Sequence, residues 1–417
     1  MKLNENPAFN KIRIDMVNAS MLPRIYRRTE HGICSKLVSK AALKVMRTLD
    51  REGFRACLVG GAVRDLLLEV PPKDFDVSTD ARPAQIRRLF KNVRLVGRRF
   101  PLAHVRFGSE IVEVATFRGQ HHVGSTRGGR IVTDNVYGTL QEDVWRRDLT
   151  VNALYYDIRD HSIIDYVSGL EDLNNKKLRV IGEPLRRYRE DPVRMLRVIR
   201  FATRLGFSID PLTEIALGTE AYRLREISPA RLFDETLKIF HGGQALVSFE
   251  FLTNSGLFQE LFPQMARLVA KRKSSQPYSF IRTVLTNTDL RIKQGKSVSP
   301  GFLLAAILWE TFDQTRVDLI EQGFSESDAY RIAEDKVVST QCRSIAIPRR
   351  VSRMVRDIWF LQRSLERPTR KRAVRIVRNP RFRAAFDLLV LRSEFGAKER
   401  GFANWWQRYL REITQNK

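Results

Sequence analysis

The stretch Leu58-Val59-Gly60-Gly61-Ala62-Val63-Arg64-Asp65-Leu66-Leu67, followed by Lys73-Asp74-Phe75-Asp76, carries the most information in this chain. An apolar strand closes on a glycine pair, an arginine follows three residues later, and two carboxylates lie one residue apart. Alternate residues of a strand point to the same face, so Asp74 and Asp76 are expected to converge on one small volume. Paired carboxylates suit Mg²⁺, and glycines let the backbone approach a phosphate closely. The stretch therefore predicts a site for a triphosphate and its metal ions.

Each piece of this pattern has a simpler explanation when it stands alone. An isolated Asp-x-Asp is commonly a solvated strand end, and a glycine pair after a strand is commonly a turn. The order and spacing of the pieces together favour the triphosphate site. The pattern is neither a P-loop nor a dinucleotide fingerprint, because both the Gly-Lys-Ser/Thr and the Gly-x-Gly-x-x-Gly sequences are absent.

Charge is the strongest compositional signal. The chain has 417 residues, 43% of them hydrophobic, and a formal net charge of +26. This length allows two or three domains with ordinary cores. A protein with a charge this positive is expected to bind a polyanion, most simply nucleic acid or an acidic membrane surface. Residues 341–417 contain 20 Lys and Arg against 6 Asp and Glu, so the C-terminal region is especially basic.

The cysteines and the hydropathy predict a cytoplasmic protein without membrane insertion. Cys34, Cys57 and Cys342 are far apart and odd in number, which argues against a zinc site and a disulfide framework. Free thiols fit a reducing cytoplasm. No apolar run approaches the ~18–20 residues that span a bilayer, and the N-terminus lacks the apolar segment of a secretory signal.

The first half of the chain predicts an α+β domain. Residues 1–35 are expected to form a polar arm, and residues 36–182 a mixed domain that opens with an amphipathic helix over 39–52. One further helix is expected over 83–90, and residues 121–132 are expected to form a loop that touches substrate. The expected strands are 56–59, 75–77, 93–96, 103–107, 111–115, 153–158 and 163–166.

The second half of the chain predicts helices only. After Gly182 the strand signals fade and helical periodicity continues to the end, interrupted by prolines. Residues 183–265 are expected to form a helical neck that binds the nucleotide base and RNA, and 266–417 a helical body with a basic C-terminal region. The polar segment 263–300 is expected to be a loop that separates two helical modules.

A third acidic group is expected beside Asp74 and Asp76, because two-metal phosphoryl transfer uses a carboxylate near the attacking hydroxyl. Glu113 is charged in the middle of an apolar strand, where it needs a partner. A metal is one such partner. A salt bridge to Arg118, or an edge-facing position, is the alternative.

Arg146-Arg147-Asp148 is the next candidate segment. Two adjacent arginines can neutralise phosphate while the aspartate orients one guanidinium. The alternative is an ordinary cap at the N-terminus of a helix. The phosphate interpretation gains from the position of this segment after the Asp-x-Asp unit.

A helix is expected to begin at Asp191-Pro192, with the aspartate as the cap. Helical geometry then places Arg194, Arg197, Arg200 and Arg204 on one strip. Asp191 only accepts hydrogen bonds and Arg194 only donates them, so the pair could read the Watson–Crick edge of a base in place of a template. The alternative is a capped helix with a solvated basic face.

These motifs, in this order, resemble the class II nucleotidyltransferases, which include the CCA-adding tRNA nucleotidyltransferases and the bacterial poly(A) polymerases. The resemblance covers residues 56–204. It implies a polymerase-β-like nucleotidyltransferase head, a mixed sheet with helices, followed by an all-α neck, body and basic C-terminal region. It implies that Asp74 and Asp76 hold Mg²⁺ and that Asp148 belongs to the catalytic set, with Glu113 as our further candidate. Nucleotide-binding residues are then expected at Gly60, Gly61, Arg64, Arg147, Asn152, Asp191, Arg194, Arg197 and Arg200.

Within this class, residues 95–105 look like the segment that marks the poly(A) branch, and the basic C-terminal region fits that branch too. The resemblance then implies a template-independent RNA 3′-end adenylyltransferase that adds AMP from ATP to cellular RNA, including mRNA, and releases pyrophosphate. The first alternative is CCA addition to tRNA. The second is a non-catalytic RNA-binding protein on a decayed polymerase head, against which the intact Asp74, Asp76, Asp148 and Arg194 argue.

A basic run over 367–383 is the predicted RNA track. It contains eight Lys and Arg and no acidic residue, and the aromatic pair Trp405-Trp406 lies beyond it. RNA is expected to bind there through phosphates and by stacking on exposed aromatic side chains. A solvated helix face is the alternative. The candidate RNA-binding residues are Arg370, Lys371, Arg372 and Arg375.

Overall fold

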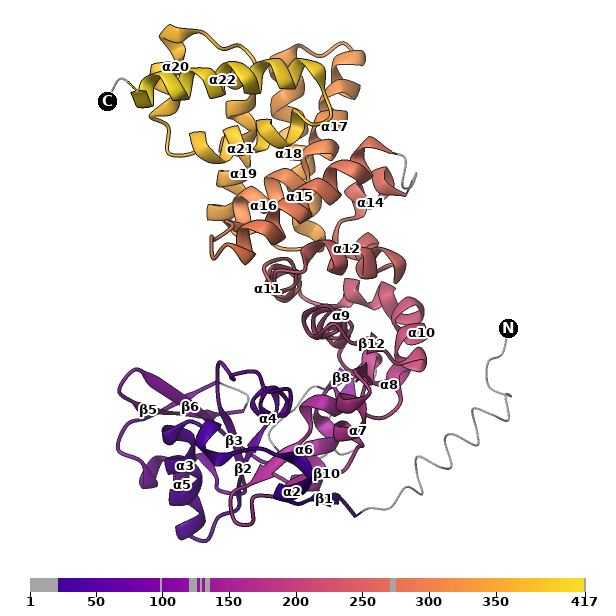
Figure 1. Cartoon of the computed structure of the whole chain (residues 1–417). Helices are drawn as coiled ribbons and strands as arrows, with labels where there is room; N and C mark the ends of the chain where they lie inside the picture. The colour runs from indigo at the N-terminus through magenta and orange to yellow at the C-terminus, as the bar shows by residue number, and fades with distance from the viewer. Residues whose placement is uncertain are drawn as a thin grey trace, which may run out of the picture. The chain divides into compact units, whose positions relative to one another are not determined.

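The computed structural model describes residues 22–97, 100–119, 126–127, 130–131, 136–270 and 275–415. Its described residues divide into two compact units, unit 1 (residues 1–194 and 206–216) and unit 2 (residues 195–205 and 217–417). Figure 1 shows the strands gathered in unit 1 and the long helices in unit 2. Each unit is described by itself below.

Unit 1 is built on an eight-stranded mixed sheet with the strand order β1-β10-β9-β2-β3-β6-β5-β4. All neighbours in this sheet are antiparallel except β3 and β6, which are parallel. The central strand β2 is buried on both faces. The strands are β1 (Arg24–Tyr26), β2 (Ala56–Val59), β3 (Asp76–Thr79), β4 (Val93–Val96), β5 (Leu102–Phe107), β6 (Glu110–Thr116), β9 (Tyr155–Asp157) and β10 (Ile163–Asp165).

Helix α3 (Lys40–Arg51) packs on β2, β3 and β6. The Ser39 side chain caps its first turn by accepting from two backbone amides, and Val45, Met46 and Leu49 form its buried stripe. Unit 1 also contains the helical segments α2 (Arg28–His31), η2 (Ser35–Leu37), α4 (Gly61–Leu67), α5 (Pro83–Leu89), α6 (Leu140–Arg146), η3 (Thr150–Asn152), α7 (Gly169–Asn174) and α8 (Pro184–Glu190). Two short ladders complete it, β7 (Thr126–Arg127) with β8 (Arg130–Ile131) and β11 (Lys177–Leu178) with β12 (Ser208–Ile209).

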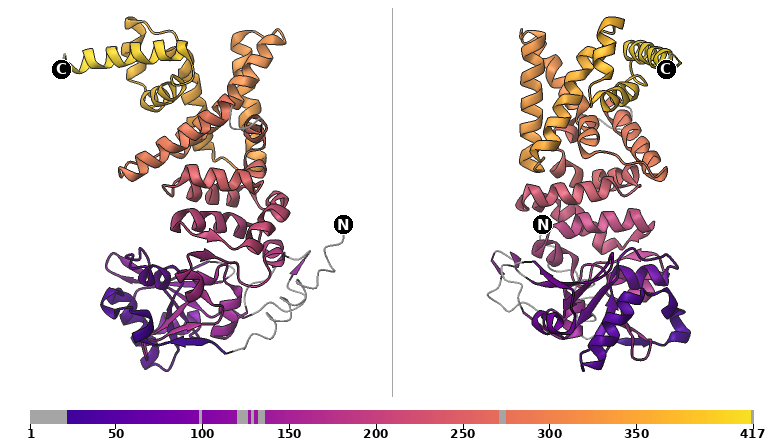
Figure 2. Two further views of the ribbon diagram at one scale, coloured as in Figure 1. Left: turned by 45° about the vertical axis from the view of Figure 1, so that its right-hand side comes forward. Right: turned by 90° about the vertical axis from the view of Figure 1, so that its left-hand side faces the viewer.

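Helices α9 (Val193–Leu205) and α10 (Pro211–Glu220) cross the division between the units, and unit 2 is otherwise helical. Figure 2 shows its C-terminal helices, coloured orange to yellow, side by side. The remaining helices are η4 (Ala221–Glu226), α11 (Pro229–Phe240), α12 (Ala245–Asn254), α13 (Leu257–Leu261), α14 (Pro263–Val269), α15 (Gln276–Lys293), α16 (Pro300–Ile307), α17 (Trp309–Glu321), α18 (Glu326–Ser344), α19 (Arg349–Leu365), α20 (Arg370–Val377), α21 (Phe382–Arg392) and α22 (Ala397–Gln415).

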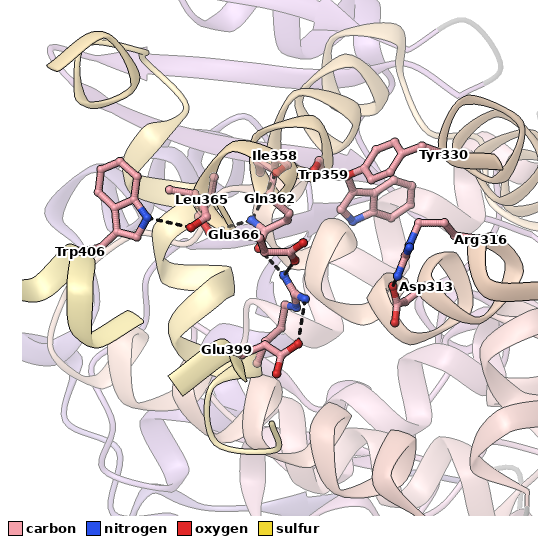
Figure 3. A network of polar contacts seen from close by, with 12 residues as sticks. Asp313, Arg316, Tyr330, Ile358, Trp359, Gln362, Leu365, Glu366, Glu399 and Trp406 are labelled. Atoms are coloured by element: carbon pink, nitrogen blue, oxygen red, sulfur yellow. Dashed lines mark hydrogen bonds and ion pairs between the residues drawn. The ribbon is translucent and has the colours of Figure 1, made fainter. Parts of the chain in front are cut away.

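A buried polar network joins α19, α21 and α22 (Figure 3). Arg392 of α21 donates to Gln362 Oε1 at 2.8 Å and pairs with Glu366 at 2.7 Å and with Glu399 at 3.5 Å. Trp406 of α22 is fully buried, and its Nε1 donates to the Leu365 carbonyl at 3.0 Å. A buried guanidinium with this many partners specifies how the three helices pack.

The predicted fold class, an α+β head followed by helices, is confirmed. The expected strands each appear within two residues of their predicted bounds, and the helix over 39–52 appears as α3. No helix in the described part of the chain is long and apolar enough to cross a bilayer.

Three local predictions were wrong. The polar arm contains β1, which pairs with β10 at the sheet edge. The single helix predicted between the strands is accompanied by α4 and α6, which are short and begin after turns. The segment 263–300 is mainly helical, because Pro263 and Pro277 stand in the first turns of α14 and α15, where proline is tolerated. Most of the predicted loop 121–132 lies outside the described residues.

Candidate active site

The glycine turn between β2 and α4 is the first component of the site. Gly60 adopts a φ of +75°, a conformation that favours glycine. A Cβ at Gly60 would lie 3.5 Å from Arg147 Nη1, and one at Gly61 would lie 3.5 Å from Arg64 Nη2. The turn therefore presents bare backbone beside two guanidinium groups, as the sequence predicted for a phosphate site.

The carboxylates gather at the start of β3. Asp76 is the first residue of this strand, and it lies opposite Glu113 of β6 in the parallel register. Burial raises the pKa of Asp76 to about 6, with further contributions from Glu113 and Asp74, while Arg147 opposes the shift. Asp74 precedes the strand, so strand alternation does not place it, although its charge acts on Asp76. The structure thus brings Asp74, Asp76 and Glu113 into one electrostatic group.

Glu113 has a partner that the sequence reasoning did not anticipate. Its side chain is 47% exposed, and Glu113 Oε1 lies 3.4 Å from His104 Nε2 on the neighbouring strand β5. The side chain is therefore not buried, and its ion-pair partner in the described part of the chain is His104, while a role for Glu113 at the metal site stays a prediction. An exposed carboxylate beside Asp76 remains available to a ligand at the sheet edge.

The donor set fits Mg²⁺ shared with a phosphate. Within the described ranges, no group of three or more His, Cys, Asp or Glu side chains forms a self-sufficient metal site. Mg²⁺ is commonly held by one or two carboxylates, with waters and substrate phosphates completing the shell. Asp74 and Asp76 supply two carboxylates, and the raised pKa of Asp76 marks a negative cluster that a cation would stabilise.

Arg147 holds a fixed positive charge at this cluster. It donates to Tyr155 Oη at 2.7 Å, to Asp143 Oδ2 at 3.1 Å and to Ser78 Oγ at 3.3 Å. Burial alone would lower its pKa, but Tyr155 and Asp143 outweigh burial and raise it. Because α6 ends at Arg146, the alternative of a cap at a helix N-terminus does not apply. The phosphate interpretation of Arg147 therefore stands on its position beside Asp76 and Gly60.

Arg64 and Asn152 are brought together as a buried pair. Arg64 Nη1 donates to Asn152 Oδ1 at 2.6 Å, and Arg64 Nε donates to Asp65 Oδ1 at 2.9 Å. Arg64 is only 2% exposed. Its guanidinium thus lies against the turn at Gly61 and supports it.

Asp148, predicted to belong to the catalytic set, lies among different neighbours. It is buried, and its Oδ1 accepts from the Leu149 amide at 2.9 Å. Burial lowers the pKa of Arg187 to about 10, and the charge of Asp148 offsets a small part of that shift. Asp148 is therefore connected to the arginine network described next.

That network links Arg147 to Arg194. Arg187 of α8 donates to the carbonyls of Arg146 at 3.0 Å and Arg147 at 2.6 Å, and its other terminal nitrogen bonds Glu190 at 2.6 Å. Arg194 Nη1 donates to Glu190 at 3.2 Å and to the Arg187 carbonyl at 2.9 Å. A continuous chain of charge-assisted hydrogen bonds therefore runs from the phosphate-side arginine to the proposed base-side arginine.

Asp191 and Arg194 flank the start of α9. Asp191 Oδ1 accepts from the Val193 amide at 3.3 Å, as expected of a cap, although the helix begins at Val193. Arg194 is buried rather than solvated, so the basic-face alternative does not describe it. Farther along α9, in unit 2, Arg197 and Arg200 are half-buried, and the Arg200 guanidinium lies 4.7 Å from the Phe201 ring.

Four residues of this site were not assigned from the sequence: Asp143, Tyr155, Arg187 and Glu190. Asp143 stands four residues before Arg147, the spacing at which helical side chains meet, so it had a detectable signal. Tyr155 had none, because only the sheet brings it to Arg147.

Comparisons with known proteins agree with this geometry. Residues 56–179 match the family described as "Poly A polymerase head domain", residues 206–268 match "Probable RNA and SrmB- binding site of polymerase A", and residues 322–417 match "Polymerase A arginine-rich C-terminus".

Similar individual proteins support the same assignment. Poly(A) polymerase I of Escherichia coli O6:H1 is 47% identical over 391 residues, which cover 91% of this chain and 84% of that protein. The CCA-adding enzyme of Lactobacillus helveticus is 36% identical over 220 residues, 53% of this chain and 54% of that enzyme. Among solved structures, the Bacillus stearothermophilus CCA-adding enzyme in complex with CTP has a TM-score of 0.58 at 25% identity, covering 88% of this chain and 80% of that one.

Fold and site together define a class II nucleotidyltransferase. The 47% identity to poly(A) polymerase I and the match to the arginine-rich C-terminus identify the branch within this class. The chain belongs to the bacterial poly(A) polymerase family, the polynucleotide adenylyltransferases that add AMP to RNA 3′ ends. The sequence-based prediction of this family and branch is confirmed.

Proposed function

We propose that this chain extends RNA 3′ ends with AMP from ATP, without a template, through the site around Asp76. The 3′-hydroxyl of the RNA attacks the α-phosphate in line, a new phosphodiester forms, and pyrophosphate leaves. The observation that carries the proposal is the joint placement of Asp76, Glu113 and Arg147 beside the bare turn at Gly60.

Each residue contributes by position and charge. Asp74 and Asp76 would hold Mg²⁺, which supplies Lewis-acid stabilisation of the charge on the triphosphate. Arg147 neutralises phosphate charge without rearranging, because Tyr155, Asp143 and Ser78 already hold its guanidinium. Glu113 lies opposite Asp76, where it can accept a hydrogen bond from the attacking hydroxyl.

Base selection is assigned to Asp191 and Arg194. Both hydrogen bonds of Arg194 within the described part of the chain use Nη1, so Nη2 can donate to a base. Asp191 supplies an acceptor beside it. From the resemblance alone, we carry Arg197 and Arg200 of the same helix as further nucleotide-binding candidates. Because a side-chain pair reads the base, no template strand is needed.

The cellular setting follows from the substrate and the thiols. We infer that the enzyme works in the cytoplasm on mRNA and other RNA 3′ ends, since all three cysteines are free thiols, which suits a reducing compartment.

The deciding experiment removes the carboxylates singly. Asp74→Ala and Asp76→Asn are each expected to reduce AMP incorporation into an unstructured RNA by more than a thousandfold, because stabilisation worth several kcal/mol is lost. Asp80→Asn, an exposed aspartate just after β3, is the matched control. Incorporation by either site variant within tenfold of wild type would overturn the assignment.

The same assay distinguishes the alternatives. Long tails from ATP alone indicate poly(A) addition, a stop after a few additions to tRNA indicates CCA addition, and no incorporation by the wild-type enzyme indicates an RNA-binding protein.

A further inference from the structure

Helix α19 presents one outward stripe that the site above does not use. Arg349, Arg353, Arg356 and Phe360 follow one another at intervals of four, three and four residues, so they lie along one face of the helix. They line a groove of about 500 Å³, together with Glu334, Ser352 and Asp357. Phe360 is 60% exposed. The stripe thus combines an accessible aromatic ring with guanidinium groups.

The opposite face of α19 is firmly anchored. Trp359, adjacent to Phe360, is fully buried, stacks on Phe312 with centroids 4.4 Å apart, and donates from Nε1 to the Ala305 carbonyl at 3.0 Å. Gln362, labelled in Figure 3, donates to the Ala385 carbonyl at 2.8 Å and accepts from Arg392 at 2.8 Å. The backbone that carries Phe360 is therefore fixed before any ligand arrives, which reduces the entropic cost of binding.

The arginines of the stripe differ in their partners. Arg356 pairs with Glu334 at 3.1 Å and also contacts Asp335, so its charge is largely neutralised. Arg349 and Arg353 are exposed and make no ion pair within the part of the chain that the structure describes. Two uncompensated positive charges therefore stand on the same face as the exposed ring.

A flat aromatic face beside unpaired guanidiniums matches the chemistry of single-stranded nucleic acid. Bases stack on aromatic rings whatever their sequence, and arginines bind the phosphates between them. An acidic peptide would use the arginines but would gain nothing specific from the ring. Trp405-Trp406, the aromatic pair noted in the sequence, is less suited, because Trp406 is fully buried.

We propose that Arg349, Arg353 and Phe360 form a binding subsite for single-stranded RNA, in which Phe360 stacks on a base and the two arginines bind neighbouring phosphates. This inference rests on the proposed function, since the RNA being extended is its ligand. It adds a defined base-stacking position to the arginine-rich C-terminal region.

The test compares two ligands on the full chain by fluorescence anisotropy: a short oligoadenylate, and a chain of equal length that has abasic nucleotides. Phe360→Ala should weaken oligoadenylate binding roughly tenfold, because one stacked base contributes about 1–3 kcal/mol. Binding of the abasic chain should not change, and Phe360→Trp should restore oligoadenylate binding. Phe324→Ala, which removes another exposed phenylalanine of unit 2, is the matched control.

Substitution of Arg349 and Arg353 should change RNA binding in a different way from substitution of Phe360. The double substitution Arg349→Gln and Arg353→Gln should weaken both ligands and flatten the log–log salt dependence by about 1.4, since each phosphate contact on a single strand contributes about 0.7. Phe360→Ala should leave that slope as in wild type.

The inference is overturned if Phe360→Ala binds oligoadenylate as tightly as wild type, or if Phe324→Ala loses as much affinity for oligoadenylate as Phe360→Ala does. It is also overturned if the double arginine variant loses affinity for an acidic polypeptide and none for RNA. AMP incorporation by wild type is measured in parallel. An active wild-type enzyme with an unaffected Phe360→Ala variant overturns the subsite alone, whereas an inactive wild-type enzyme overturns the proposed function.

Discussion

Arg194 is the residue at which base choice can be tested directly. Arg194→Ala should raise the KM for ATP and weaken the preference for ATP over other nucleotides, because a lost donor to a base edge costs roughly 1–3 kcal/mol, by analogy with side chains that read DNA bases. Steady-state kinetics with each of the four nucleotides measures the effect. If KM and preference both stay as in wild type, Arg194 serves only the internal network with Glu190.

Arg187 connects the base side of the site to the phosphate side without needing to touch substrate itself. It bonds the Arg146 and Arg147 carbonyls and, through Glu190, fixes Arg194. Arg187→Met should therefore reproduce both the raised KM and the weakened ATP preference of the Arg194 variant, and also lower kcat by displacing Arg147.

Its neighbour Arg186 is the matched control, since it also pairs with Glu190, at 3.1 Å, but has a side chain that is 77% exposed. Arg186→Met should retain wild-type selectivity. Equal effects of the two substitutions would contradict a positioning role for Arg187.

At the scale of elements, the sequence predicted individual helices and strands better than it predicted which strands pair with each other. Strand β2 follows from its short run of buried apolar residues, and α3 follows from its cap and stripe, whereas β4 is largely exposed. The pairing of β3 with β6 does not follow from local sequence, because paired residues such as Asp76 and Glu113 are 37 positions apart in the chain. The same contrast holds for the residues of the site. Gly60, Asp76 and Arg147 could be predicted from the sequence. Tyr155 and His104 could not, because only the register of the sheet brings them to the site.

Helix α17 contains a carboxyl group whose titration should be visible in stability. Burial, with repulsion from Asp313, raises the pKa of Glu310 to about 7 from its ordinary 4.5, while Arg392 of α21 opposes the shift. The folded chain therefore holds a proton that the unfolded chain lacks between these two values. The stabilisation is complete below pH about 4.5 and is lost as the pH rises through about 7.

Glu310→Gln removes this titration, so the variant should be more stable than wild type above pH 7, and the difference should disappear near pH 4.5. Thermal unfolding followed by tryptophan fluorescence suits the measurement, because four of the five tryptophans, all but Trp145, lie in unit 2. Glu321→Gln, at the exposed end of the same helix, is the matched control. An unchanged difference between Glu310→Gln and wild type across this pH range would show that Glu310 is not the responsible group.

For the whole molecule, the net charge of +26 is more informative when paired and unpaired arginines are separated. In the basic run 367–383, Arg367 pairs with Glu326, Arg370 with Glu412, Arg381 with Asp357 and Arg383 with Asp387. Lys371, Arg372 and Arg375 of α20 are exposed and have no ion pair within the described residues. The run is basic, but carboxylates of α18, α19, α21 and α22 neutralise part of it, Arg370 included, and its role as an RNA track stays a prediction.

This separation gives a sharp expectation for RNA binding. Replacing Lys371, Arg372 and Arg375 together by Gln should weaken RNA affinity and flatten its log–log salt dependence by about 2, since each lost phosphate contact on a single strand contributes about 0.7. The triple replacement of Arg367, Arg381 and Arg383 changes the net charge equally, yet it should flatten the slope far less, because those side chains already have carboxylate partners. Anisotropy titrations of one labelled RNA across a salt series measure both variants. Equal slopes for the two would mean that RNA senses only the total charge of the C-terminal region, whereas a difference confined to the unpaired set identifies α20 as the phosphate-binding helix.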